Sequence, residues 1–160
     1  MKKSEIRVAL DALKEIKLPK IEDKDIRNTI IENHFILLDA SRKVDEKVED
    51  NRKVFLAAHK AEEKAVNELK AKIVEATNRD NKVALSKELR EKYQCYFDAV
   101  DEFNESVDKL YAEEVPGLKP IDREKFIEEL KNMDDFNLAW VEALYPLFMV
   151  SDGDKQPKKE

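Results

Sequence analysis

Five carboxylates recur along one segment at spacings that place them on one face of a helix. They are Asp98, Asp101, Glu102, Glu105 and Asp108. Residues three and four apart are neighbours on a helix surface, so these side chains form an acidic strip suited to a hard cation or a basic partner. Calcium-binding loops need a glycine at a sharp turn, and this segment has none. We therefore expect the acidic strip to be a solvated flank, paired with lysines of an opposing helix.

The two histidines do not complete a helical di-iron centre. Such centres carry Glu-x-x-His on two helices, but Ile31 stands three residues before His34, and Leu56 three before His59. On a straight helix the two histidines are about 38 Å apart, so they cannot share one ion. We expect His34 to be partly buried with a backbone partner and His59 to lie on a helix surface. No metal and no other cofactor is predicted.

Nucleophiles are equally few. Cys95 is the one cysteine, and no histidine falls near it in the helix pairing expected below, so a Cys–His nucleophile is not supported. We interpret Cys95 as a small apolar filler or a bystander thiol. Gly117 and Gly153 are the only glycines, and no Gly-x-Ser-x-Gly, P-loop or Gly-x-Gly-x-x-Gly motif occurs. The sequence predicts a protein that is not an enzyme, without catalytic or cofactor-binding residues.

Composition and net charge limit which classes of partner and which cellular compartment are expected. Of the 160 residues 41% are charged and 42% hydrophobic, and the net charge is −6. A negative chain disfavours non-specific binding to nucleic acid or anionic lipid, and no apolar run approaches the roughly 18 residues of a membrane span. A lone cysteine excludes an intramolecular disulfide, which favours a reducing cytosol. We expect a cytoplasmic protein that binds protein partners and neither nucleic acid nor membrane. The sequence identifies no small-molecule substrate.

The elements that carry these residues are helices. Between Pro19 and Pro116 there is no glycine and no proline, so the two strongest breakers of regular structure are missing from that span. Apolar residues recur there at helical spacing, and residues 77–81 form the best loop candidate. We predict long helices over about 24–76 and 83–114. Asp50-Asn51 is a candidate break in the first, and we favour continuity because no cap or glycine marks a stop.

An a/d seam indicates how the two long helices pair. The second helix carries apolar residues at alternating spacings of four and three. They are Leu89, Tyr93, Tyr96, Val100, Phe103, Val107 and Leu110. Folding the chain back near residue 79 places Phe55 opposite Phe103, Lys60 near Asp98 and Lys53 near Glu105. The pattern predicts an all-α fold, a helical bundle built on a long antiparallel helical hairpin that resembles a coiled coil.

Shorter helices should pack at one end of this hairpin. We expect a first helix from Ser4, its N-cap, to about Lys17, and C-terminal helices over about 122–146. Asp122 should cap the first of these C-terminal helices. Asp134 or Asp135 should cap the second.

The domain organisation follows from these elements. We predict a single helical domain over residues 1–150 and a disordered polar tail over 151–160. The start of the long first helix carries a second apolar stripe, Ile31, Phe35 and Leu38, beside the stripe that includes Ile30 and Leu37. A helix that is apolar on two faces is packed on two sides, so we expect this part to lie inside a bundle.

The functional prediction comes from the distal part of the hairpin. The short helices are too few to cover this part. That distal part is a pair of helices with a thin core, and a symmetric dimer forming a four-helix bundle would complete it. The candidate partner-binding residues there are Val66, Leu69, Ile73, Leu85 and Leu89. We predict a non-enzymatic structural or protein-interaction protein that self-associates as a homo-oligomer, most simply a dimer.

The alternative is a regulatory binding module, such as an adaptor, an antitoxin-like inhibitor or a helical chaperone. It would capture a basic partner through Asp98, Asp101, Glu102 and Glu105 of the acidic strip. A stable homodimer would favour the first reading, and a monomer bound to a basic protein would favour the second.

A lysine-rich start, a short first helix and an acidic, all-helical body together give one general resemblance. In these features the chain is similar to small helical proteins of unknown role encoded among phage and mobile-element genes. The resemblance implies an accessory role in assembly, with a virion-associated location if the gene belongs to a phage.

Overall fold

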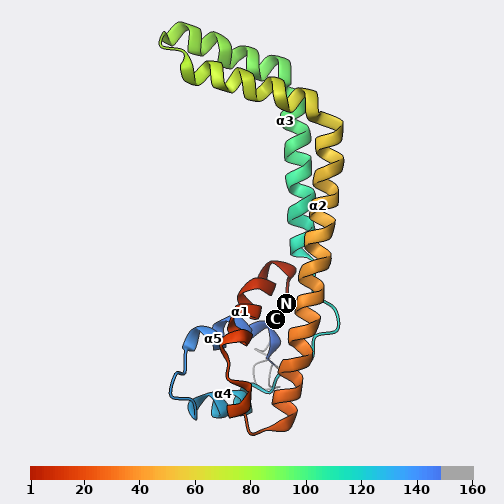
Figure 1. Cartoon of the computed structure of the whole chain (residues 1–160), viewed down its shortest axis with the longest axis vertical. Coiled ribbons are helices and arrows are strands. Elements are labelled where there is room, and N and C mark those ends of the chain that lie inside the picture. Colours follow the sequence, from red (N-terminus) through yellow and green to blue (C-terminus); the bar gives the residue numbers. More distant parts are fainter. Residues whose placement is uncertain (149–160) are drawn as a thin grey trace, which may run out of the picture. The chain divides into compact units, whose positions relative to one another are not determined.

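The computed structural model describes residues 1–148, whose regular elements are helices (Figure 1). They are α1 (Ile6–Glu15), α2 (Lys24–Glu75), α3 (Arg79–Ala112), α4 (Arg123–Lys131) and α5 (Leu138–Leu144), with 3-10 turns η1 (Lys3–Glu5), η2 (Leu18–Lys20) and η3 (Tyr145–Leu147). Within this range no strand forms, and the extended pairings are two isolated bridges. The all-α fold with a long helix pair is confirmed. The tail expected over 151–160 lies outside the described residues.

The chain groups into two compact units. Residues 1–44 and the described residues from 111 onward form one, called here the terminal unit. Residues 45–110 form the other, the hairpin unit. The chain passes from the terminal unit to the hairpin unit within α2 and returns within α3. The single domain expected over 1–150 thus corresponds to two such units.

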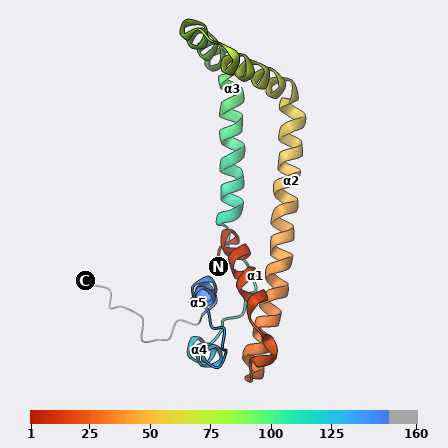
Figure 2. The ribbon, with the colours of Figure 1, turned by 60° about the vertical axis from the view of Figure 1, so that its left-hand side comes forward.

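The core of the terminal unit forms where the short helices pack with the first part of α2. Both views place α1 beside this part of α2 (Figures 1 and 2). Every helix of the unit contributes buried apolar side chains to one cluster. Among them are Leu10 and Leu13 of α1, Ile30 and Leu37 of α2, Phe126 and Leu130 of α4, and Trp140 and Leu144 of α5. Each such side chain stabilises the fold by about 1.5–3 kcal/mol when fully buried, so this cluster is the main source of stability in the unit.

A buried amide fastens the connection after α3 to α2. The side chain of Asn33 has 0% exposure. Its Nδ2 donates to the carbonyl oxygen of Lys119, and its Oδ1 accepts from the backbone N–H of Lys119, both at 2.8 Å. These two bonds give Nδ2 and Oδ1 of the amide one hydrogen-bond partner each, so the side chain is buried without a large desolvation cost. Gly117, with φ +80°, supplies the left-handed backbone that this connection needs.

One of the expected helix caps is confirmed. Asp122 Oδ1 accepts from the backbone N–H groups of Glu124 and Lys125 and so caps α4. The cap expected at Ser4 is wrong: Ser4 lies inside η1, and α1 begins at Ile6 without a side-chain cap.

The cap of α5 is also not the expected one. Asn137 caps this helix by accepting from the backbone N–H of Ala139 at 2.9 Å. Asp135 and Asp134 instead form ion pairs with Lys17 and Lys20, at 2.5 and 3.7 Å. Asn137, the next residue with a short acceptor side chain, caps the helix in their place.

The hairpin unit pairs α2 with α3 in the expected register. The ring centroids of Phe55 and Phe103 are 5.2 Å apart, which confirms that pair. The turn is slightly earlier than predicted, because α2 ends at Glu75 and α3 begins at Arg79. Asn78 stabilises that start, since its Oδ1 accepts from the backbone N–H of Asp80.

Both long helices depart from helical geometry at one place each. His59 has φ −120° and ψ 15°, and Tyr93 has φ −118° and ψ 20°. Both views show the two helices of the hairpin unit changing direction together (Figures 1 and 2). Asp50 and Asn51 are helical, so the predicted continuity of this helix is confirmed at these residues. The actual deviations carry neither proline nor glycine, so no sequence breaker marked them.

Candidate protein-interaction surfaces

The seam of the hairpin unit is thinly covered. Val66 and Leu69 are the buried apolar residues in 45–110, with 1% and 8% exposure. Ile73, Leu85 and Leu89 are only half-buried. The structure therefore divides the five predicted partner-binding residues into two groups. Val66 and Leu69 form the floor of the seam inside the hairpin, and the other three keep surface that a second chain could cover.

Aromatic side chains pack at the level of the two helix deviations. Phe55 lies 4.8 Å from the ring of His59 and 6.2 Å from that of Tyr96, between centroids. Burial raises the pKa of the Tyr96 hydroxyl above its ordinary value, and the carboxylates of Glu63 and Glu62 add to the rise. His59 Nδ1 lies 2.7 Å from Glu62 Oε2. His59, expected on a helix surface, is half-buried, and its ring contacts those of Phe55 and Tyr96.

The acidic strip is exposed along α3. Asp98, Asp101, Glu102 and Glu105 all face solvent. Asp98 Oδ1 accepts a hydrogen bond from Gln94 at 2.8 Å. The expected pairing across the hairpin is not found among the described residues: Lys53 pairs with Asp50 of its own helix, at 3.9 Å, and not with Glu105. The strip is thus solvated as expected, but its carboxylates are not neutralised by the opposing helix.

Metal and thiol chemistry gain no support from the geometry. No group of three or more His, Cys, Asp or Glu side chains in the described residues is arranged to hold a metal ion. Cys95 is exposed, which fits the bystander thiol rather than the apolar filler. Across residues 1–148 no helix is long and apolar enough to cross a membrane.

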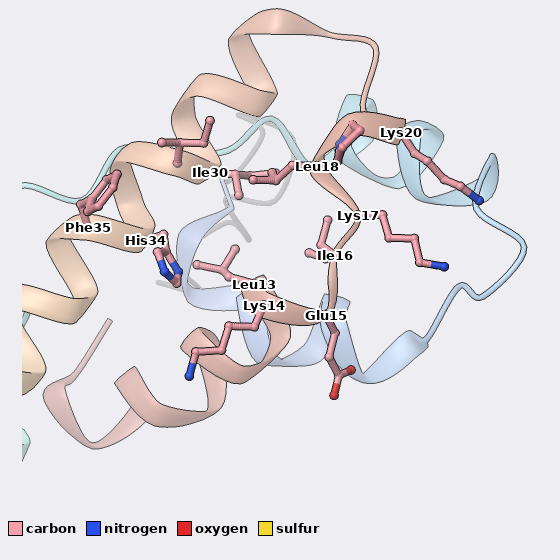
Figure 3. A pocket seen from close by; sticks show the side chains of 12 residues that line it. Leu13, Lys14, Glu15, Ile16, Lys17, Leu18, Lys20, Ile30, His34 and Phe35 are labelled. Atoms are coloured by element: carbon pink, nitrogen blue, oxygen red, sulfur yellow. The ribbon is translucent and has the colours of Figure 1, made fainter.

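A groove in the terminal unit was not expected from the sequence. It has a volume of about 780 Å³ and lies between α2 and the segment from the end of α1 to η2 (Figure 3). Its apolar lining includes Leu13, Ile16 and Leu18 on one side and Ile30 and Phe35 on the other.

His34 also lines this groove, from α2. Its ring is half-buried and lies edge-on to Phe35, with 6.1 Å between centroids. The predicted partial burial is confirmed. The predicted backbone partner is not found among the described residues.

Lysines occupy the rim of the groove. Lys14, Lys17 and Lys20 are spaced three residues apart on the same side. Their ammonium groups meet carboxylates of this chain: Lys17 meets Asp135 and Lys20 meets Asp134, while Lys14 has Asp11 of its own helix at 3.7 Å. All three lysine side chains remain substantially exposed, and exposed ion pairs of this kind contribute little to stability.

The second apolar stripe of α2 continues the groove along the helix surface. Ile31, Phe35 and Leu38 are 37%, 64% and 41% exposed. The prediction that this stripe is packed inside a bundle is therefore wrong for the described residues. α1, α4 and α5 cover the neighbouring face of α2 through Ile30 and Leu37 and leave this one open. The sequence did contain the signal, since the two stripes were visible, but it could not say which of them would be left uncovered.

Comparison with known proteins adds no relative. No protein-family model, no curated protein and no solved structure matches this chain.

Proposed function

We propose that this chain is a non-enzymatic protein-interaction protein that self-associates through the hairpin unit. The observation that supports the proposal is the thin cover of the hairpin seam. Over 66 residues, from Asp45 to Leu110, only Val66 and Leu69 are buried apolar side chains. The other seam positions of α3, including Leu89, Tyr93 and Phe103, are half-buried.

The physical reason is that two helices cannot enclose a seam. Each a/d side chain of a lone pair contacts one neighbouring helix, so part of its apolar surface stays in water. A second hairpin placed against the first makes a four-helix bundle in which the same side chains face a common core. Each Å² of apolar surface removed from water contributes about 25 cal/mol, and a row of half-buried residues along one face supplies a continuous area for that gain. A twofold dimer uses the same face on both copies.

A charge on the seam tests the proposal. Light scattering during size exclusion should give a dimer for the wild type and a monomer for Leu89→Lys, because the ammonium group would be buried without a partner in the dimer. Glu88→Gln raises the net charge by the same single unit one residue away, at an exposed site, and should remain dimeric.

Circular dichroism distinguishes loss of the dimer from unfolding of the variant. Leu89→Lys should retain helical content, since part of this side chain reaches solvent in the monomer and a lysine there can place its ammonium group in water. A wild type that stays monomeric at high micromolar concentration would overturn the proposal. So would a Leu89→Lys protein that remains a dimer.

A second function is favoured by the unpaired charges of the acidic strip. Asp101, Glu102 and Glu105 are exposed and form no ion pair with lysines of α2 in the described structure. A basic partner would find these carboxylates available. Binding of a lysine-rich helical peptide that weakens in salt and is lost in Glu102→Gln/Glu105→Gln would support this function. A monomeric wild type with such binding would favour it over self-association.

Either function suits an accessory component of an assembly, the role that the resemblance to phage and mobile-element proteins implies. Self-association builds repeated contacts from one chain. Capture of a basic partner would bring a second protein into such an assembly.

A further inference from the structure

The hairpin unit consists of two arms that meet at its bend. We call residues 45–58 of α2 and 94–110 of α3 the base arm, and residues 60–92, which include the turn of the hairpin, the tip arm. His59 and Tyr93, the residues that depart from helical geometry, separate the two arms on each helix. The α2 segments of the base and tip arms are about 21 and 24 Å long at 1.5 Å per residue. The arms therefore match in length.

The bend restricts how two copies of the hairpin unit can pair along both arms (Figures 1 and 2). A twofold dimer relates the copies by one rotation of 180°. An axis that runs along one arm pairs that arm with its counterpart, but it turns the other two arms away from each other. An axis that crosses one arm at right angles has the same result. An axis that bisects the angle between the arms instead lays the base arm of each copy antiparallel to the tip arm of the other, so both arms are covered.

The net charges of the two arms have opposite signs. The base arm contains nine Asp or Glu and four Lys or Arg, which gives a net charge of −5. The tip arm contains nine Lys or Arg and seven Asp or Glu, which gives +2. Pairing base arm with base arm would bring like charges together, whereas pairing base arm with tip arm brings opposite charges together. Symmetry and charge therefore favour the same orientation.

Charged groups on both arms are available for such pairing. In the base arm, Asp101, Glu102 and Glu105 are exposed and form no ion pair among the described residues. In the tip arm, Lys64 and Lys72 are likewise exposed and form no ion pair within the described part of the chain. No ion pair within the chain has to be broken before these five side chains can interact with a second copy.

We propose that the tip arm of a second copy covers the half-buried seam of the base arm, antiparallel to it, about a twofold axis at the bend. This inference rests on the proposed self-association and specifies which surfaces meet. Leu85 lies eight residues before Tyr93, and Val100 and Phe103 lie seven and ten residues after it, so these half-buried side chains come to the same level in the dimer. The apolar seam supplies affinity, and the charges of the arms select the orientation. The basic partner of the acidic strip is then the tip arm of this same protein.

Cysteine cross-linking of the full-length protein tests the orientation. Asn81→Cys and Asn104→Cys, each combined with Cys95→Ser, place a single exposed thiol on the tip arm and on the base arm. The two positions lie twelve residues before and eleven after Tyr93, so the proposed axis brings Asn81 of one copy to the level of Asn104 of the other. After subunit exchange, a short bis-maleimide should join the two variants into a covalent dimer. Either variant alone is the matched control and should give little covalent dimer.

Charge reversal tests what selects this orientation. The strip variant changes the net charge of the base arm from −5 to +3 through Asp98→Lys, Asp101→Lys, Glu102→Lys and Glu105→Lys. Its dimer should dissociate about tenfold or more easily in analytical ultracentrifugation, because both arms are then positive. Adding Lys64→Glu and Lys72→Glu changes the tip arm from +2 to −2 and should restore the affinity. The two lysine substitutions without the strip variant should weaken the dimer, since both arms are then negative. All substituted residues are exposed, and circular dichroism should show unchanged helical content.

The outcomes separate this proposal from self-association itself. A wild-type monomer would overturn both. A wild-type dimer in which Asn81→Cys or Asn104→Cys cross-links alone, and the mixture gives no additional product, would overturn only the orientation. A strip variant that dimerises as tightly as the wild type, or a folded combined variant whose affinity is not restored, would show that the tip arm does not face the base arm.

Discussion

Truncation of Phe103 to Ala measures how completely the hairpin seam is buried. Full burial of a phenylalanine makes its replacement by alanine cost about 3–5 kcal/mol. Phe103 is half-buried within a single chain, and its ring lies 5.2 Å from that of Phe55. About half of the full value, plus an aromatic pair contribution of about 0.5–1.5 kcal/mol, gives an expected loss of roughly 2–4 kcal/mol for the monomer. The ring would be fully buried in a four-helix dimer, so the loss should rise toward the upper value there.

Urea denaturation followed by far-ultraviolet circular dichroism measures this loss, at a low and a high protein concentration. Val54→Ala is the matched control, because Val54 is an exposed apolar residue of the same unit and its truncation should change stability by less than about 0.5 kcal/mol. The double variant with Phe55→Ala should show a coupling energy of about 0.5–1.5 kcal/mol between the two rings.

Two outcomes would contradict this reasoning. A loss below about 1 kcal/mol for Phe103→Ala would mean that the two rings do not pack as described. A loss that does not change with protein concentration would mean that no second chain covers the seam, and it would count against self-association.

Further predictions concern single groups. Asn33→Ala should destabilise the terminal unit by about 2–3 kcal/mol in urea titrations followed by Trp140 fluorescence, since it breaks two hydrogen bonds to Lys119 and leaves a small cavity; an unchanged midpoint would refute the role of the amide. Hydrogen bonds from the backbone of Ile26, and then of Asp25, lower the pKa of the Asp23 carboxyl. Its contribution to stability is therefore present above its unfolded pKa and lost as pH falls through the folded value, and Asp23→Ala should flatten the acid limb of thermal melts. The raised pKa of Tyr96 has the opposite sign: its contribution is complete below about pH 10, the unfolded pKa of tyrosine, and is lost as pH rises beyond it. Tyr96→Phe should remove that part of the alkaline loss, and an unchanged alkaline profile would show that Tyr96 does not titrate within the cluster.

The sequence by itself determined the helices and the pairing of the long ones. Because glycine and proline are absent between Pro19 and Pro116, helical periodicity is the only local sequence signal for secondary structure there. The a/d spacing then selects one register, because a shifted pairing would place charged residues in the seam. That is why the contact between Phe55 and Phe103 was predictable from two positions 48 residues apart. The Asp122 cap followed from a local preference in the same way.

Tertiary structure decided the bend at His59 and Tyr93. No proline or glycine marks it, and it lies where the rings of His59 of α2 and Tyr96 of α3 meet. It also decided the cap of α5, where Asn137 accepts from the backbone N–H of Ala139 while Asp135 and Asp134 lie beside Lys17 and Lys20. Asp and Asn are about equally good N-caps, so local sequence does not choose among these three residues.

Tertiary structure likewise chose which stripe of α2 remained open. Both stripes are apolar, so local sequence cannot rank them. The choice depends on where α1, α4 and α5 pack, and they cover Ile30 and Leu37. Ile31, Phe35 and Leu38 are left exposed for that reason. Hydrophobic periodicity predicts that a helix face packs against a neighbour. Only the tertiary structure shows whether that neighbour is part of the same chain.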